Sequence, residues 1–155
     1  MSDKRKELIV SAISNGTVID HIPTENVFQV IKILGLHKLS NPLYFGTNLE
    51  SKKFGSKGII KVSDKYFEPE EINKIALVAP SATLIEIHDY EVVRKSTVTI
   101  PEKVDKIVKC FNPNCITNKE DVSTKFTVLY DEAGNLKLAC HYCEKNTSKE
   151  NIVFI

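Results

Sequence analysis

The 155-residue sequence lacks the apolar segments that direct a chain into or across a membrane. No apolar run approaches the roughly 20 residues that a membrane-spanning helix needs. Near the start, the charged segment 1–5 is followed by an apolar run over residues 8–10 only, which is too short for the apolar centre of a signal peptide. We therefore expect a cytoplasmic protein with no membrane partner.

An excess of charge of one sign is also lacking. Lys and Arg together number 21 and Asp and Glu together number 20, and the segment after residue 100 holds eight lysines and eight acidic residues. Proteins that grip nucleic acid usually carry a basic surface, because their affinity comes largely from neutralising phosphates. The charge balance therefore argues against the one nucleic-acid reading that the sequence offers, a zinc-ribbon module that binds DNA or RNA.

The familiar catalytic motifs are missing as well. The sequence contains no Gly-rich phosphate loop, no nucleophile elbow of the G-x-S-x-G type, and no cluster of histidines and carboxylates at metal-ligand spacing. Catalysis therefore has no evident site in this sequence.

Cysteine occurs only four times, and all four residues lie near the end of the chain. Four residues separate Cys110 from Cys115, and two residues separate Cys140 from Cys143. Between the two pairs lie 24 residues, enough for a hairpin that returns the second pair to the first. This layout predicts one tetrahedral site in which four thiolates bind Zn²⁺. Because four protein ligands complete the coordination of the metal, we expect a structural ion that contributes folding energy.

Two other interpretations of the cysteines stay open at this point. They could form two disulfides, although no secretory segment is expected and small disulfide scaffolds are usually denser in cysteine. Cys140 and Cys143 could form a redox pair, but they lack the βαβ setting of such pairs and have partner cysteines upstream.

Up to about residue 97, the hydrophobic pattern predicts a ferredoxin-like α+β sandwich. Helices are expected over residues 24–35, with Thr24 as the N-cap and Gly35 as the C-terminal cap, and over residues 69–79, ended by Pro80. Runs rich in β-branched and apolar residues predict strands over residues 8–13, 17–22, 43–49, 58–62, 83–87 and 90–93. This order suits an antiparallel sheet with both helices on one face.

The composition changes between residues 94 and 102, where helical periodicity is absent. We place a domain boundary there, which gives an N-terminal domain over residues 1–97 and a C-terminal domain over residues 102–155. In the second domain, strands over 126–130 and 136–139 flank a turn, and a last strand is expected over 151–155. The second domain is therefore expected to be small, all-β and zinc-ribbon-like.

A few polar and aromatic side chains in the first domain could contact a ligand. Asp20 and His21 are adjacent, and since neighbouring strand residues point to opposite faces, we expect them not to act together on one substrate atom. They could equally have surface or capping roles. Lys61 and Lys95 could hold phosphates if they share a sheet face, or could simply be solvated. Tyr90 could stack on a base or belong to the core.

Several stretches together resemble the regulatory chain of aspartate carbamoyltransferase, an enzyme of pyrimidine synthesis. They are residues 16–23 (GTVIDHIP), 59–62 (IIKV), 79–83 (APSAT), 90–93 (YEVV) with 95–96 (KS), 101–102 (PE) and 140–144 (CHYCE). The spacing of the cysteines completes the resemblance, which spans nearly the whole chain.

The resemblance implies a non-catalytic, allosteric subunit. The N-terminal domain of such chains binds the nucleotides CTP, UTP and ATP and pairs with a second copy, and the C-terminal zinc domain docks on the catalytic chain. The implied assembly is a dodecamer of two catalytic trimers and three regulatory dimers. CTP, sometimes with UTP, inhibits such enzymes, and ATP usually activates them.

The resemblance also implies a nucleotide pocket. The backbone of residues 10–13 would meet the base, Asp20 and His21 would lie near the base, ribose and phosphates, Lys61 near the ribose and Lys95 at the triphosphate, and the remaining residues would form the wall. The full set is Val10, Ser11, Ala12, Ile13, Asp20, His21, Lys61, Ile87, Tyr90, Val92 and Lys95.

Overall fold

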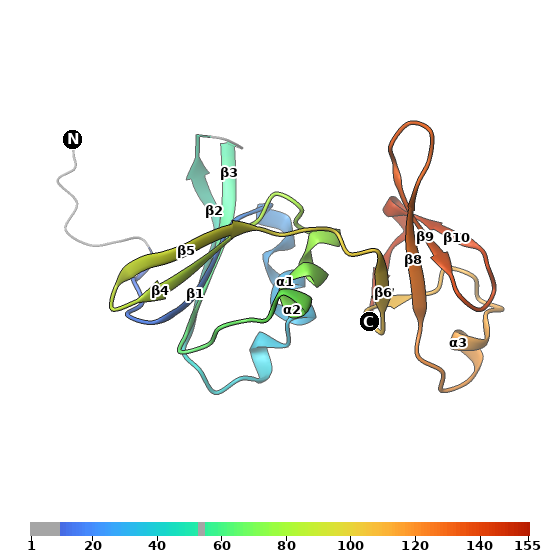
Figure 1. Cartoon of the computed structure of the whole chain (residues 1–155), viewed down its shortest axis with the longest axis horizontal. Helices are drawn as coiled ribbons and strands as arrows, with labels where there is room; N and C mark the ends of the chain where they lie inside the picture. Colours follow the sequence, from blue (N-terminus) through green and yellow to red (C-terminus); the bar gives the residue numbers. More distant parts are fainter. Residues whose placement is uncertain (1–9, 53–54) are drawn as a thin grey trace. The chain divides into compact units, whose positions relative to one another are not determined.

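The computed structural model describes residues 10–52 and 55–155. They form two compact units, with the division between Ile100 and Pro101. Figure 1 shows helices α1 and α2 with one sheet in the first unit, and smaller sheets with helix α3 in the second. None of the helices in these described ranges has the length and hydrophobicity of a membrane span.

The first unit is built on a five-stranded antiparallel sheet with the order β2-β3-β1-β4-β5. Its strands are β1 (Gly16–Ile22), β2 (Leu43–Ser51), β3 (Gly55–Ser63), β4 (Thr83–His88) and β5 (Glu91–Thr97). Strands β1 to β4 lie in the sheet order β2-β3-β1-β4, and one helix follows β1 and another follows β3, which is the ferredoxin-like arrangement. The predicted α+β fold is therefore confirmed, with β5 added at one edge.

The helices of the first unit are shorter than expected. They are α1 (Val27–Ile33) and α2 (Pro69–Asn73), and the chain continues from both in short 3₁₀ turns. The four 3₁₀ turns of the described chain are Thr24–Asn26, Leu36–Lys38, Lys74–Leu77 and Lys149–Asn151. Tight turns of this kind are frequent where an α-helix begins or ends.

Gly35 ends α1 in the left-handed conformation (φ 66°), as predicted. The N-cap prediction for Thr24 is wrong, because Pro23 precedes the first turn and no side chain caps it. The Thr24 hydroxyl instead accepts a hydrogen bond from the backbone N–H of Asn48 in β2. The side chain therefore links the start of the helical segment to the neighbouring strand.

Both helices pack on one face of the sheet, as Figure 1 shows, and the main core lies between them and the sheet. The fully buried side chains of this core include Ile19, Ile22, Val27, Val30, Ile60 and Ile75. A smaller apolar cluster lies on the opposite face of the sheet, which we call the outer face. It consists of Ile13, Val18, Ile59, Ile85 and Ile87.

The strand predicted over residues 8–13 is not observed. Residues 8 and 9 lie outside the described residues, and residues 10–13 do not belong to a strand. The carbonyls of Val10 and Ser11 accept hydrogen bonds from the Lys61 side chain, so a tertiary contact replaces the strand pairing that the β-branched pattern predicted. Ile13 is nevertheless buried, in the cluster on the outer face.

The second unit contains a four-stranded sheet with the order β10-β9-β8-β6 and a two-stranded sheet of β7 and β11. Its elements are β6 (Lys103–Asp105), β7 (Val108–Lys109), α3 (Ile116–Lys119), β8 (Lys125–Tyr130), β9 (Leu136–Cys140), β10 (Asn146–Ser148) and β11 (Val153–Phe154). The predicted hairpin of 126–130 and 136–139 is confirmed. The predicted last strand is shorter than expected, because a 3₁₀ turn occupies Lys149–Asn151.

The core of the second unit is small and centres on Val104, Val108, Phe126 and Leu138, each no more than 2% exposed. A core this small contributes little stability by itself, so a unit of this size usually needs an additional constraint such as a metal.

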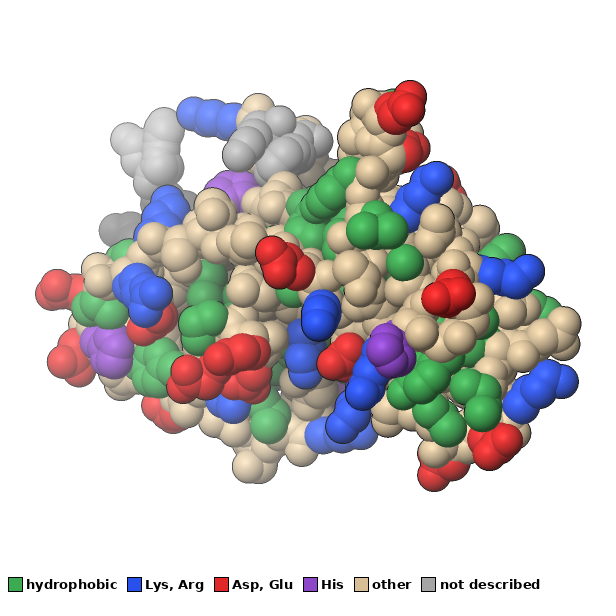
Figure 2. All heavy atoms as spheres, turned by 45° about the vertical axis from the view of Figure 1, so that its right-hand side comes forward, with side chains coloured by type: hydrophobic (Ala, Val, Ile, Leu, Met, Phe, Trp, Pro, Cys, Tyr) green, Lys and Arg blue, Asp and Glu red, His purple; other side chains and the backbone are tan. Residues whose placement is uncertain are grey.

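On the face of the molecule drawn in Figure 2, basic and acidic side chains are interspersed, and no broad area carries charge of one sign.

Gly58 on β3 packs against the Val27 side chain at the start of α1. A Cβ atom at this position would overlap the Val27 side chain and lie near the Gly46 carbonyl. We predict that Gly58→Ala lowers the free energy of unfolding by about 1–3 kcal/mol, the usual cost of overpacking. Denaturant unfolding followed by circular dichroism measures this, with Ser56→Ala in the same strand as the control. Equal stability of the two variants would contradict the packing described here.

Candidate functional site

The four cysteines converge in the second unit. Cys110 follows β7, Cys115 directly precedes α3, Cys140 ends β9 and Cys143 lies in the turn after it. Their four sulfur atoms all lie within 4.8 Å of one another. The Sγ–Sγ distance is 3.7 Å for Cys110 and Cys143 and also 3.7 Å for Cys115 and Cys140. The predicted four-cysteine cluster is therefore confirmed.

The spacing of the sulfurs fits a tetrahedral metal ion. Zinc–thiolate bonds of about 2.3 Å place the corners of a tetrahedron about 3.8 Å apart, close to the two observed contacts. Cys110, Cys115 and Cys140 are buried, while Cys143 is half-buried. Four converging thiolates suit soft, tetrahedral metals such as zinc, and they leave no position for an activated water.

Side-chain and backbone amides hold the loop of the first cysteine pair in shape. The Asn118 amide donates to the carbonyls of Cys110 (3.0 Å) and Asn112 (2.7 Å). The backbone N–H of Cys115 donates to the same Asn112 carbonyl at 3.0 Å. These bonds fix the direction in which both cysteines of the loop point.

Hydrogen bonds to sulfur divide the cysteines into two types. Burial raises the pKa of Cys110 to about 12, against the effect of the Asn112 backbone N–H. For Cys143, burial also acts to raise the pKa, but the Lys145 backbone and the Asn112 side chain lower it to about 7. Burial also acts to raise the pKa of Cys115, but hydrogen bonds from the hydroxyl and the backbone N–H of Thr117 lower this pKa overall. These hydrogen bonds thus favour the thiolate form of Cys115 and Cys143, whereas burial favours the neutral thiol of Cys110.

A second group of candidate residues lies on the outer face of the first unit. The strand register places Lys61 opposite Val18, Val18 opposite Ile85, and Ile85 opposite Lys95. Residues directly opposite one another in an antiparallel sheet point to the same face. Three strand spacings of about 4.8 Å separate the two lysine backbones, so they lie about 14 Å apart with an apolar surface between them.

Lys61 is the lysine of this pair that is held in place. Its Nζ donates to the carbonyls of Val10 (3.1 Å) and Ser11 (3.0 Å). Burial lowers the pKa of Lys61, and the nearby Asp20 carboxylate partly offsets this. The contact brings the start of the described chain against the outer face.

Asp20 and His21 lie at a β-bulge, because β1 carries one extra residue relative to β3 between Ile19 and Ile22. The bulge holds His21 in the left-handed region (φ 59°). The His21 Nδ1 consequently lies 3.1 Å from the Thr83 hydroxyl, although Thr83 pairs with Asp20 across the sheet. The expectation that Asp20 and His21 point to opposite faces is therefore wrong, since it assumed a regular pleat.

The other residues predicted for the pocket differ in exposure. Ile13 and Ile87 are buried together in the outer-face cluster. Val92 lies opposite Ile87 and is 60% exposed, and Tyr90 in the β4–β5 turn is 70% exposed. Ala12 is exposed. The structure thus places Ile87 and Val92 on the outer face beside Ile13, while Tyr90 lies in the turn between β4 and β5.

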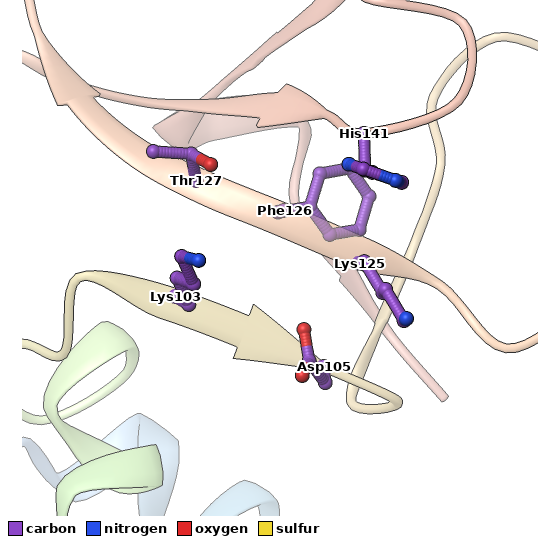
Figure 3. A pocket seen from close by; sticks show the side chains of 6 residues that line it. All are labelled: Lys103, Asp105, Lys125, Phe126, Thr127 and His141. Atoms are coloured by element: carbon purple, nitrogen blue, oxygen red, sulfur yellow. The ribbon is translucent and has the colours of Figure 1, made fainter.

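A separate hollow of about 230 Å³ lies on the sheet of the second unit. In Figure 3, Lys103 and Asp105 project from β6, Lys125 and Thr127 from β8, and His141 comes from the turn after β9. The strand register places Lys103 opposite Thr127 and Asp105 opposite Lys125. None of the four cysteines lines this hollow, so it is distinct from the metal centre.

Comparison with known proteins now identifies the family. Residues 8–99 match the model of the aspartate carbamoyltransferase regulatory chain, allosteric domain, and residues 102–153 match the model of its metal binding domain. The chain belongs to the aspartate carbamoyltransferase regulatory chain family.

Curated regulatory chains resemble it over their whole length. The regulatory chain of Phocaeicola vulgatus is 53% identical over 152 residues, which cover 98% of this chain and 97% of the relative. The regulatory chain of Parabacteroides distasonis is 50% identical with the same coverage. The regulatory chain of Pyrococcus horikoshii is 53% identical over 149 residues, which cover 95% of this chain and 97% of the relative.

Several residues of this regulatory chain that contact the candidate sites are not among the predicted site residues. Lys57 forms an ion pair with Asp20 (2.8 Å), and the Thr117 hydroxyl donates to the Cys115 sulfur (3.2 Å). The signal for Thr117 was its place two residues after a cysteine. Lys57 and Thr83 carried no comparable signal, because only the strand register brings them to Asp20 and His21.

Metal removal gives a direct prediction for this architecture. We predict that chelation of the metal from the full chain unfolds the second unit and leaves the first folded, because the cysteines join segments that a small core holds weakly. Amide correlation spectra should lose the dispersed signals of residues 103–154 and keep those of β1–β5. Adding metal back should restore them. Dispersed signals from the second unit in protein proven to be metal-free would contradict the prediction.

Proposed function

We propose that this chain is the non-catalytic allosteric subunit of a cytoplasmic aspartate carbamoyltransferase in pyrimidine nucleotide synthesis. The N-terminal domain (1–97) binds CTP, UTP or ATP, and the C-terminal domain (102–155) holds one Zn²⁺ and docks on the catalytic chain. The observation that carries the nucleotide part is the row Lys61–Val18–Ile85–Lys95 on the outer face, which combines two cationic ends with an apolar middle.

Each part of a nucleotide has a chemical counterpart on this face. The apolar cluster of Val18, Ile85 and Ile87 suits the faces of a base, and the nearby backbone of residues 10–13 supplies groups that read its polar edge. Lys61, already in contact with backbone carbonyls, suits ribose hydroxyls. Lys95 is exposed at the other end of the row and suits the triphosphate.

Asp20 and His21 complete the polar side of the proposed pocket. The Asp20 carboxylate accepts the backbone N–H of His21 (2.7 Å) and pairs with Lys57. The β-bulge turns the imidazole toward Thr83 on β4. A bulge that re-aims side chains beside a binding site is a common arrangement, and here it would place both polar groups near the ribose and phosphates.

Pairing with a second copy is supported by the edge position of β2. This strand stands at one end of the sheet order, so no second strand of the described chain pairs with its outer edge. Phe45 on β2 and Phe28 on α1 are 43% and 64% exposed, and their rings contact edge to face at 5.4 Å. An edge strand next to exposed aromatic rings favours association with another copy. We propose that such dimers, three per dodecamer, bridge two catalytic trimers.

The metal centre supports docking of the second unit on the catalytic chain. Phe111, Ile116 and Tyr142, which are adjacent in sequence to the cysteines, are 59%, 42% and 39% exposed. Zinc would hold these apolar side chains in a fixed arrangement on the loops of the cluster. Large exposed apolar residues on a rigid surface are typical of protein-binding sites.

The allosteric effect follows from linkage between the two sites. A nucleotide on the first unit changes activity elsewhere only if it binds one quaternary state better than the other, and such couplings are typically ~1–3 kcal/mol. The second unit would transmit this preference, because it is the part that contacts the catalytic chain. No residue of the regulatory chain then needs to take part in chemistry.

The phosphate role of Lys95 is testable by comparing two ligands. We predict that Lys95→Ala weakens CTP binding about 10- to 100-fold, as expected for loss of a charge-assisted contact, and changes cytidine binding less than about twofold. Calorimetric titration of the full chain measures both affinities. The matched control is Arg94→Ala, because Arg94 is the neighbour on the other face and lies 3.7 Å from Glu86. An equal loss for CTP and cytidine would remove the proposed phosphate contact.

The docking role is tested by disrupting the metal centre. We predict that Cys115→Ser abolishes association with the catalytic chain, because the exposed residues around the cluster lose their fixed arrangement, while CTP still binds the first unit. Analytical ultracentrifugation of the mixed chains measures assembly, and calorimetry measures CTP binding. Ser123→Ala, an exposed change in the same unit, serves as the control. Normal assembly of the Cys115 variant would refute the proposed role of the metal centre.

A further inference from the structure

The metal centre has a side-chain donor that is not itself a ligand. The Thr117 Oγ1 donates to the Cys115 Sγ at 3.2 Å. Cys115 is 1% exposed, so water has almost no access to its sulfur.

The fold gives the Thr117 hydroxyl this direction. Thr117 is the second residue of α3, and Cys115 directly precedes the helix. Threonine hydroxyls within helices often bond a carbonyl of the preceding turn. Here the hydroxyl turns to the sulfur instead. The neighbouring Asn118 side chain holds the carbonyls of Cys110 and Asn112, which fixes the start of α3 against the cysteine loop.

Charge explains what such a donor would do. Four thiolates and one divalent ion carry a net charge of −2, and three of the four sulfurs are buried. A buried charge is costly unless hydrogen bonds compensate for it. Donors to metal ligands also fix ligand orientation, and their loss typically reduces metal affinity about 10- to 100-fold.

We propose that Thr117 is a positioning residue of the metal centre, which stabilises the Cys115 thiolate through its O–H···S hydrogen bond and thereby raises the affinity for the metal. This inference rests on the proposed occupancy of the site by a divalent ion. Cys115 would then be held both by the metal and by the Thr117 hydroxyl.

Cobalt substitution tests the proposal in the full-length chain. Thr117→Val keeps the shape of the side chain and removes the donor, so the sulfur becomes more electron-rich. We expect the sulfur-to-cobalt charge-transfer band to move to lower energy, and the affinity for Co²⁺ and Zn²⁺, measured against a competing chelator, to fall about 10- to 100-fold. Thr117→Ser retains a hydroxyl and should restore both properties. Thr127→Val, an exposed threonine on β8, should leave both unchanged.

The outcomes separate this inference from the proposed function. If the wild-type chain binds neither cobalt nor zinc, the proposed metal centre fails. If it binds them and Thr117→Val matches the wild type in band position and affinity, only the role of Thr117 is overturned. Should the valine variant fail to fold, the cadmium-loaded wild-type chain decides the question. A scalar coupling between the Thr117 hydroxyl proton and the metal nucleus supports the hydrogen bond, and its absence overturns the proposal.

Discussion

The convergence of four thiolates on one point is the constraint on which the second half of this molecule depends. The cysteines come from two loops of the chain, 110–115 and 140–143, and their sulfurs lie within 4.8 Å of one another. Without a cation between them, four sulfurs this close would gain little, since ionised thiolates repel and neutral thiols bond weakly. The metal therefore links the two cysteine loops and gives the exposed residues beside them a fixed geometry.

The first half of the molecule depends on the difference between the two faces of its sheet. Helices α1 and α2 cover the inner face and bury the large apolar core. The outer face keeps a small apolar cluster with Lys61 and Lys95 at its two ends. Strand alternation produces both faces from the same segments, so one sequence pattern supplies both stability and the proposed nucleotide surface.

The features that the sequence predicted well are those that local pattern determines. Cysteine spacing predicted the cluster, and Gly35 and Pro69 marked helix boundaries correctly. The failures needed tertiary information. The β-bulge that redirects His21 depends on the pairing of β1 with β3. Instead of the strand expected over residues 8–13, the backbone carbonyls of Val10 and Ser11 accept hydrogen bonds from the Lys61 side chain. Strands as short as β7 carry too few residues to show a period.

We propose that nucleotide sensing lies on the outer face of the first unit and not in the second unit, which contains the metal centre. Hydrogen exchange of the metal-loaded chain with and without CTP measures which residues the nucleotide protects. We expect slower exchange in residues 10–22, 58–62 and 83–97, with no change in residues 102–155 of the isolated regulatory chain. Protection centred on the cysteine loops, or on the helix-covered face alone, would contradict it.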